Sequence, residues 1–154
     1  MENIVFDSGI KEYRINEGGT LRFNPSDPNL YVRFLDAMDK VKAMEKELAE
    51  GAAALESSDD PARSGAAILR LMQEADCKIK AILTEVFGGD NDFDRILAGV
   101  NLLAMGSNGQ RVIINLLSAL EPILTAGAQS YADSQTQTAV ARAKQNRAKR
   151  KAAQ

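Results

Sequence analysis

An acidic run at residues 90–94 is the stretch of this chain whose side chains come nearest to a metal site. Its sequence, Asp-Asn-Asp-Phe-Asp, resembles the opening of a calcium-binding loop, in which carboxylate and amide oxygens coordinate the ion. Such a loop needs glycine at its sixth position and glutamate at its twelfth, and these positions hold Arg95 and Asn101. The run is better explained as a helix cap in an acidic connector, so we predict no calcium or other metal.

Two glycine pairs, Gly18-Gly19 and Gly88-Gly89, could in principle belong to phosphate-binding loops. Such loops connect a strand to a helix and carry either a following Gly-Lys-Ser or a G-x-G-x-x-G pattern. Neither pair has this context. We therefore expect the first pair to serve a turn and the second to end a helix as a left-handed C-cap.

Residues suited to catalysis are scarce. The chain has no histidine, the commonest general base and metal ligand. Its one cysteine, Cys77, lies in an apolar helical pattern, so we expect a buried and unreactive thiol. The carboxylate pairs Asp36 with Asp39 and Asp59 with Asp60 are expected to be solvated surface charges. These residues predict a protein that is not an enzyme and that uses no cofactor.

The charge of the C-terminus is the strongest functional signal. Residues 139–154 contain six basic side chains and no acidic one, whereas the preceding 138 residues hold 13 basic and 21 acidic ones. An acidic body of about −8 is thus followed by a cationic arm of about +6, and arms of this kind usually contact another molecule. The best candidates for partner contact are Arg142, Lys144, Arg147, Lys149 and Arg150.

Three interpretations of this arm remain open from the residues. It could neutralise nucleic-acid phosphates, and binding would then weaken steeply with salt. The arm has no aromatic side chain to stack on bases, which argues against specific RNA recognition. It could instead dock on a protein, with its charge raising the association rate, or it could simply keep the chain soluble.

The elements that position these residues begin with strands in residues 1–24. An apolar run at residues 4–6 predicts one short strand, and alternating apolar residues predict two more on either side of a four-residue loop at 16–19. Leu21 and Phe23 share one face of the last strand. Because an isolated hairpin is marginal in water, we expect this face to lie on the helices.

Two helices follow, and each begins with an Asp-Pro pair. Aspartate caps a helix N-terminus and proline suits the first helical position, so helices should begin at Asp27-Pro28 and Asp60-Pro61. Apolar residues then recur every three or four positions, to about Leu55 in the first helix and to Phe87 in the second. A polar break at residues 56–59 separates the two. The core is expected to include Phe34, Met38, Met72 and Phe87.

Two further helices complete the predicted fold. Asp90 or Asn91 should cap a short third helix over about residues 93–103. Pro122 should kink or divide the fourth helix. From residue 136 onward the chain has helix-forming residues but no apolar stripe, so this part is expected to be partly disordered until it is bound.

Together these elements predict a mainly α (α+β) fold: a bundle of about four helices with a short N-terminal β-hairpin. Residues 1–135 should form one domain and residues 136–154 the basic arm. Aromatic residues make up only 5% of the chain, so the core must use Leu, Ile, Val, Met and Ala, which favours packed helices. We find neither a signal-peptide pattern nor an apolar run of about 20 residues, so we expect a cytoplasmic protein without membrane contact.

Three segments resemble small proteins that are encoded in the tail-gene clusters of tailed bacteriophages and prophages. They are residues 21–34 (Leu-Arg-Phe-Asn-Pro-Ser-Asp-Pro-Asn-Leu-Tyr-Val-Arg-Phe), the connector at 87–93 and the ending at 146–150 (Asn-Arg-Ala-Lys-Arg). The chain is similar in these segments to phage tail assembly chaperones, which are mostly helical and end in a basic tail of the Asn-Arg-x-x-Arg kind.

The resemblance implies a non-enzymatic assembly factor in the cytoplasm of the bacterial host, absent from the mature virion. Such a chaperone binds the tape measure protein and assists polymerisation of the tail tube. The implied partners are therefore the tape measure protein and the tail tube protein, with a homo-oligomer as a further option. Two alternatives are a regulatory or packaging protein that binds nucleic acid through the arm, which the acidic body disfavours, and a structural accessory protein of the virion.

Overall fold

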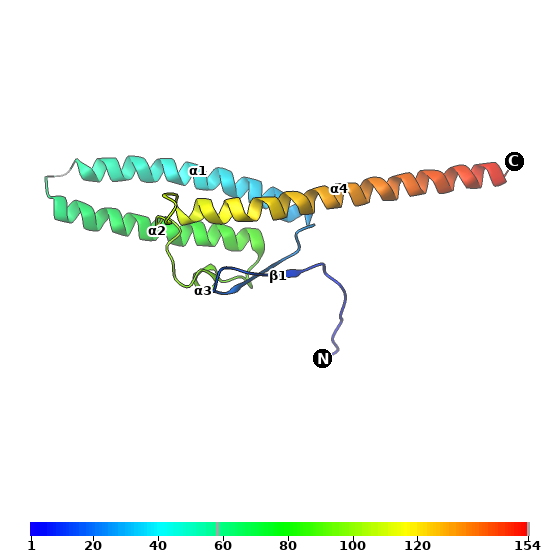
Figure 1. Cartoon of the computed structure of the whole chain (residues 1–154), viewed down its shortest axis with the longest axis horizontal. Helices are drawn as coiled ribbons and strands as arrows, with labels where there is room; N and C mark the ends of the chain where they lie inside the picture. Colours follow the sequence, from blue (N-terminus) through cyan, green and yellow to red (C-terminus); the bar gives the residue numbers. More distant parts are fainter. Residues whose placement is uncertain (58, 154) are drawn as a thin grey trace.

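The computed structural model describes residues 1–57 and 59–153 and confirms the mainly α fold (Figure 1). An antiparallel pair of long helices forms the body, the first half of a third long helix lies on it, and the second half projects into solvent. The β-hairpin lies across the body, near the end from which this helix projects. The elements are β1 (Lys11–Arg14), β2 (Thr20–Phe23), α1 (Pro28–Glu56), α2 (Pro61–Phe87), α3 (Phe93–Ile96) and α4 (Val112–Ala152).

Both long helices of the body begin where the Asp-Pro pairs predict. The Asp27 carboxylate accepts a hydrogen bond from the backbone N–H of Asn29 at 2.9 Å, and Asp60 accepts one from the N–H of Arg63 at 3.3 Å. These bonds satisfy N–H groups that a helix N-terminus leaves without intrahelical partners. Of the polar break predicted between the helices, Ser58 lies outside the described residues.

The core consists of aliphatic and phenylalanine side chains from β2, from all four helices and from the segment between α3 and α4. Phe34 and Phe87 are buried, and Met38 and Met72 are half-buried against the core, which confirms their predicted core positions. Each fully buried side chain of this kind contributes about 1.5–3 kcal/mol. The side chains with at most 1% of their surface exposed are Leu21, Phe34, Ile79, Leu83, Leu102, Ile113 and Leu124.

The hairpin is fastened to the body through its apolar face, as predicted. Tyr13 pairs with Leu21 in the antiparallel register, and Leu21 and Phe23 are buried. The Phe23 ring stacks on Tyr13 with centroids 4.7 Å apart and meets the edge of Phe87 at 5.1 Å. Packing of these rings explains why a two-stranded sheet is stable here.

The two glycines of the hairpin loop lie in the predicted turn, but neither adopts positive φ. Positive φ falls on Asn16 (50°), whereas the two glycines make a close approach to Ile96. The N–H of Gly19 donates to the carbonyl oxygen of Ile96 at 3.1 Å. A β-carbon on Gly18 would come within 2.5 Å of the same oxygen, so glycine is needed for contact with α3.

The apolar run Ile4–Phe6 does not form a strand, contrary to prediction. Residues 1–10 form neither helix nor strand, and the side chains of Ile4, Val5 and Phe6 are largely exposed. A strand forms only when a neighbouring backbone pairs with it, and within the described chain β1 pairs with β2 alone.

The third helix is much shorter than predicted, and its cap is Asp92 rather than Asp90 or Asn91. The Asp92 carboxylate accepts from the N–H groups of Asp94 and Arg95. The helix ends at Ile96 because Ala98 and Gly99 both adopt positive φ, at 53° and 75°. Tertiary contacts of the following residues, described below, override the helical periodicity.

Gly88 ends α2, as predicted, but in another conformation. Its φ of 109° requires glycine, whereas its ψ of 153° is extended rather than left-handed helical. The N–H of Gly88 still donates to the Thr84 carbonyl, and the N–H of Asn91 donates to the carbonyl of Gly88. The chain thus leaves α2 in a turn that brings Asn91 back towards the body.

Helix α4 continues through Pro122, which does not divide it. Proline cannot donate to the carbonyl four residues earlier, that of Ser118. Pro122 and Ser118 are both exposed, so water can satisfy this carbonyl. The helix also continues to Ala152, whereas the arm was expected to be partly disordered. The predicted boundary between domain and arm, at residue 136, therefore falls within α4.

Among the described residues, α4 is the one helix that is long and apolar enough to cross a membrane by length and composition, whereas no such stretch was expected from the sequence. The cores of soluble proteins contain helices that meet the same criterion. Ile113, Leu116, Leu120 and Leu124 in the first half of α4 are buried in the bundle. Burial against α1 and its neighbours accounts for the apolar character of these positions.

Candidate interaction surfaces

The five arm residues predicted to contact a partner all lie on the projecting half of α4, and all are exposed. Among the described residues, none of their side chains forms an ion pair or a hydrogen bond within the chain. A helix advances 100° per residue, so these five side chains spread around most of its circumference. The structure therefore arranges them as a cationic sleeve and does not gather them into one patch.

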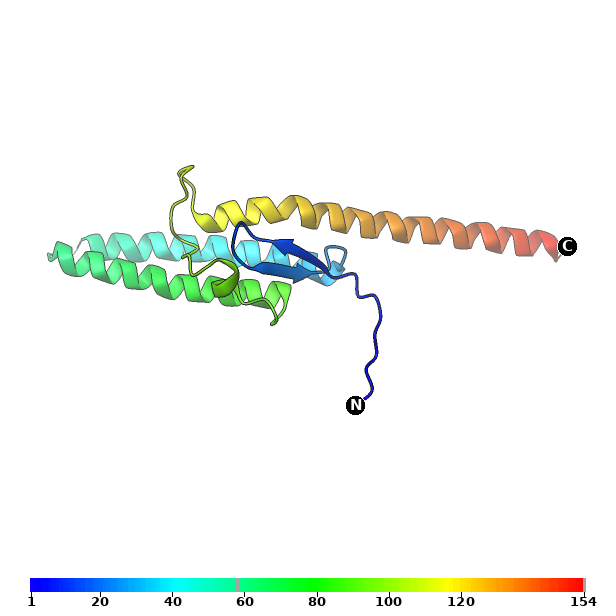
Figure 2. The same cartoon turned by 60° about the horizontal axis from the view of Figure 1, so that its bottom comes forward.

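The arm projects because the buried stripe of α4 changes its chemistry. Every seventh residue faces nearly the same side of a helix, and this series reads Leu117, Leu124, Tyr131, Thr138 and Gln145. The first two are buried and Tyr131 is already 40% exposed. Beyond Leu124 the series offers little apolar area for packing on the body, so the helix separates from it (Figure 2).

Gly127 makes a close contact between α4 and the body. A β-carbon at this position would overlap the carbonyl group of Pro25, in the segment just before α1. The absence of a side chain thus lets the α4 backbone lie directly on the chain that enters α1. This contact fixes the point from which the arm projects.

A cleft of about 320 Å³ lies where the N-terminal segment, β2, the start of α1 and the end of α2 meet. Its ionisable side chains are Arg22, Asp27, Arg33 and Asp90. Asp27 caps α1, and Arg22 forms an exposed ion pair with Glu12 at 3.2 Å. Two of the four ionisable groups that line the cleft thus have structural roles.

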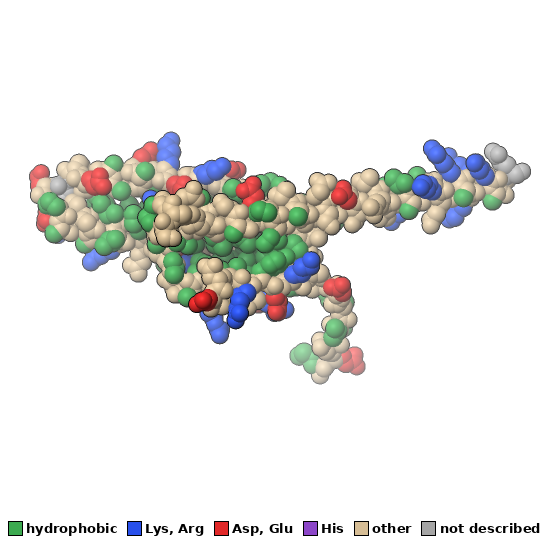
Figure 3. All heavy atoms as spheres, in the orientation of Figure 1, with side chains coloured by type: hydrophobic (Ala, Val, Ile, Leu, Met, Phe, Trp, Pro, Cys, Tyr) green, Lys and Arg blue, Asp and Glu red, His purple; other side chains and the backbone are tan. Residues whose placement is uncertain are grey.

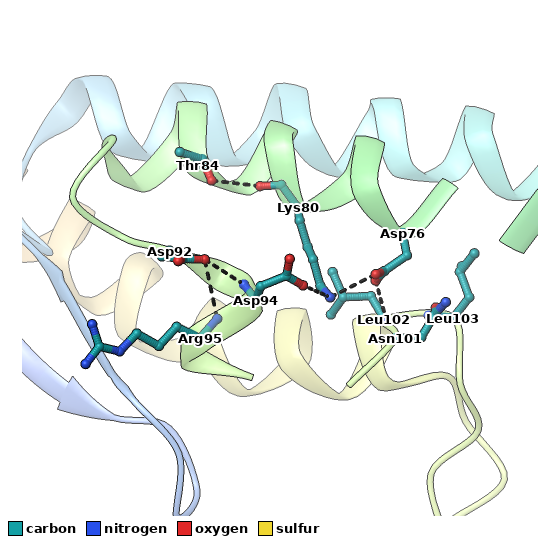
Figure 4. A network of polar contacts seen from close by, with 9 residues as sticks. All are labelled: Asp76, Lys80, Thr84, Asp92, Asp94, Arg95, Asn101, Leu102 and Leu103. Carbon is teal, nitrogen blue, oxygen red and sulfur yellow. Dashed lines mark hydrogen bonds and ion pairs between the residues drawn. The ribbon is translucent and has the colours of Figure 1, made fainter. Parts of the chain in front are cut away.

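An ion cluster joins α2 to α3 and to the segment that follows α3 (Figure 4). The Lys80 ammonium lies 2.8 Å from the Asp76 carboxylate and 2.6 Å from that of Asp94. The other oxygen of Asp76 accepts a hydrogen bond from the backbone N–H of Leu102 at 2.7 Å. The side chains of Lys80 and Asp76 retain only 9% and 11% of their surface exposed.

The electrostatics of this cluster keep Lys80 charged. Desolvation by burial, the largest influence, lowers its pKa, but the hydrogen bonds and charges of Asp76 and Asp94 together outweigh it and raise the pKa above its ordinary value. The two carboxylates together thus offset the cost of burying the ammonium. The cluster fastens residues 94–102 to α2, and its role is structural.

The sequence contains a signal for part of this cluster, although the cluster was not predicted. Asp76 and Lys80 lie four residues apart and alternate with Met72, Ile79 and Leu83 on the apolar side of α2. Two opposite charges at core positions with this spacing indicate a buried ion pair. The third member, Asp94, could not be found in this way because it comes from another element.

The side chain of Asn91 connects the β-hairpin to the end of α2 through hydrogen bonds. Its side-chain oxygen accepts from the N–H of Arg22, and its amide nitrogen donates to the carbonyls of Arg22 and Phe87, each at 2.9 Å. The amide thus pairs with the edge of β2 as a neighbouring strand would. In the acidic run predicted to be a cap, Asn91 therefore holds the hairpin, Asp92 caps α3 and Asp94 pairs with Lys80.

Cys77 is exposed, contrary to the prediction of a buried thiol. The buried side chains around it are Ala75, Asp76, Ile79 and Lys80, and helical rotation turns position 77 away from that face.

Comparison with protein-family models, with curated proteins and with solved structures found no match to this chain.

Proposed function

We propose that this protein is a non-enzymatic assembly factor, a phage tail assembly chaperone that binds the tape measure protein and assists tail tube polymerisation in the host cytoplasm. The observation that carries the proposal is the outer half of α4, about 25 residues of exposed helix with basic side chains around it. A helix without tertiary packing is marginal in water, so this segment gains stability when a partner covers it. The tail-cluster resemblance of residues 21–34, 87–93 and 146–150 supplies the identity of the partner.

The N-terminal segment supports the same proposal by offering an apolar contact. Ile4, Val5 and Phe6 expose 86%, 83% and 76% of their surface on a chain without regular structure. Removing these side chains from water by contact with an apolar partner surface is favourable in free energy. A long helical partner such as the tape measure protein would supply apolar area to this segment while its acidic residues meet the arm.

Co-expression with the tape measure protein of the same gene cluster tests the proposal. We expect the parent chain to bring that partner into the soluble fraction and to copurify with it. Reversing two arm charges, with Arg147→Glu and Arg150→Glu, should reduce the copurified partner several-fold. The matched control, Lys40→Glu with Lys42→Glu on α1, makes the same change in net charge and should leave the yield unchanged. A tape measure protein that stays insoluble with the parent chain contradicts the proposal.

A second candidate function is nucleic-acid binding, which the sleeve of cations around the end of α4 favours. Its affinity for random duplex DNA would depend steeply on salt because each phosphate contact releases counterions. A Kd weaker than about 10⁻⁴ M at physiological salt rejects this function, since that value is the weak end of ordinary non-specific binding.

Mass spectrometry of purified particles tests a structural virion role, because an assembly chaperone should be absent from them.

A further inference from the structure

The two ends of this elongated molecule carry opposite charge. Residues 47–60, at the turn between α1 and α2, contain five acidic residues and no basic one, and we call this segment the acidic tip. The arm at residues 139–154 has six basic residues and no acidic one. Figure 3 shows acidic side chains at the end where α1 and α2 join and basic side chains along the far end of α4. The acidic residues of the tip are Glu47, Glu50, Glu56, Asp59 and Asp60, and all are exposed.

The arm cannot reach the tip of its own chain. Gly127 of α4 lies on Pro25, next to the start of α1, and from there the two helices run in opposite directions (Figures 1 and 2). At 1.5 Å per residue, the projecting half of α4 and the length of α1 place the end of the arm about 80 Å from the tip. Such a distance is roughly eight Debye lengths at 0.1 M salt, so the two charges of one molecule do not interact.

Between two molecules the same charges can come into contact. We propose that the arm of one copy docks on the acidic tip of a second copy, so that the protein self-associates head to tail. Like ends repel, which excludes arm-to-arm and tip-to-tip pairing. The tip half of the α1–α2 pair also extends beyond the start of α4, so no third helix of the described chain covers it there, and the arm of the second copy can lie beside it (Figures 1 and 2).

Such an interface joins two different surfaces, so its assembly is open-ended. Each copy that contributes its arm keeps a free tip, and a chain of copies can grow unless it closes into a ring. Because the contact is made of exposed charges, its strength should fall as salt is added. Self-association of this kind involves the protein alone and does not rest on the proposed function.

Sedimentation of the purified full-length chain over a range of concentrations tests the proposal. At about 50 mM NaCl we expect species larger than the monomer, with at least a roughly tenfold weaker Kd at about 0.5 M NaCl. Arg147→Glu with Arg150→Glu disables the arm, and Glu50→Lys with Glu56→Lys disables the tip. Each double variant should be monomeric, with circular dichroism to show that its helices remain. The control Lys40→Glu with Lys42→Glu should associate as the parent does.

Mixing the two disabled variants gives the sharpest result. The arm-disabled copy still has a tip and the tip-disabled copy still has an arm, so together they should form a 1:1 dimer that cannot grow further. A parent chain that is monomeric throughout at low salt overturns the proposal. So does association that persists unweakened at high salt, or a mixture of the two variants that stays monomeric. None of these results depends on the tape measure protein, so the two proposals fail separately.

Discussion

Replacing Gly127 by alanine should weaken the contact that anchors α4. The added methyl group overlaps the carbonyl of Pro25, so α4 must move away from the body or the entry to α1 must shift. Forcing an extra methyl into a packed contact costs about 1–3 kcal/mol. Alanine also favours the helix over glycine by about 1 kcal/mol, which offsets part of this cost. We expect a net loss of up to about 2 kcal/mol in the free energy of unfolding.

Gly65 of α2 provides the matched control, because a β-carbon there meets no atom within 4 Å. Gly65→Ala should therefore stabilise the protein by about 0.5–1 kcal/mol through helix propensity alone. Since 1 kcal/mol shifts Tm by roughly 2–4 °C in a chain of this size, the two alanine variants should melt on opposite sides of the parent.

Differential scanning calorimetry measures both variants, and hydrogen exchange locates the effect. In Gly127→Ala, amides near the middle of α4 should exchange faster than in the parent, while those of α2 should change less. If Gly127→Ala melted at or above the temperature of Gly65→Ala, the close packing of α4 on Pro25 would be refuted.

Three further substitutions test the contacts that hold the fold. Lys80→Met leaves Asp76 buried beside Asp94 without its cation and should cost about 3–5 kcal/mol in urea unfolding. Folding raises the pKa of Lys80, so the stabilisation from its charge is fully present below about pH 10.4 and is lost as pH rises through the folded-state pKa. The parent should therefore lose stability above about pH 10.4, whereas Lys80→Met should show no such loss from this group. Asn91→Ala removes three hydrogen bonds and should destabilise the β-hairpin by about 1–3 kcal/mol. Hydrogen exchange measures the effect, because the Arg22 amide should exchange faster in the variant. Unchanged exchange of this amide would argue against the role of Asn91 in holding the β-hairpin. Pro122→Ala restores a helical hydrogen bond and should raise the stability of α4 by up to about 3 kcal/mol, and a loss of stability would contradict an exposed, tolerated proline.

Much of the fold could be predicted because its signals are local. Asp27 and Asp60 sit before prolines and cap the N–H groups only two or three residues ahead, so their roles follow from the neighbouring sequence. Alternation placed Leu21 and Phe23 on the buried face of the hairpin. The charge pattern alone singled out the basic arm, and the structure adds that its residues are exposed on the projecting half of α4.

The third helix shows where local signals stop being sufficient. Its periodicity extends to residue 103, yet the chain leaves the helix after Ile96 because the N–H of Leu102 bonds to the Asp76 carboxylate on another helix. The local sequence likewise favours a cap at Asn91, because its partner Arg22 is distant in the chain. In both cases the backbone group that decides the conformation comes from outside the segment.

The sequence by itself determined where α1 and α2 begin, that residues such as Phe34 and Phe87 belong to the core, and that acidic and basic charge lie in different parts of the chain. These properties depend on side-chain type and on spacings of a few residues. Only the tertiary structure decided that Gly127 brings α4 onto Pro25, that α4 then leaves the body, and that the two charged regions lie at opposite ends. Packing sets these relations because it joins residues that no local pattern connects.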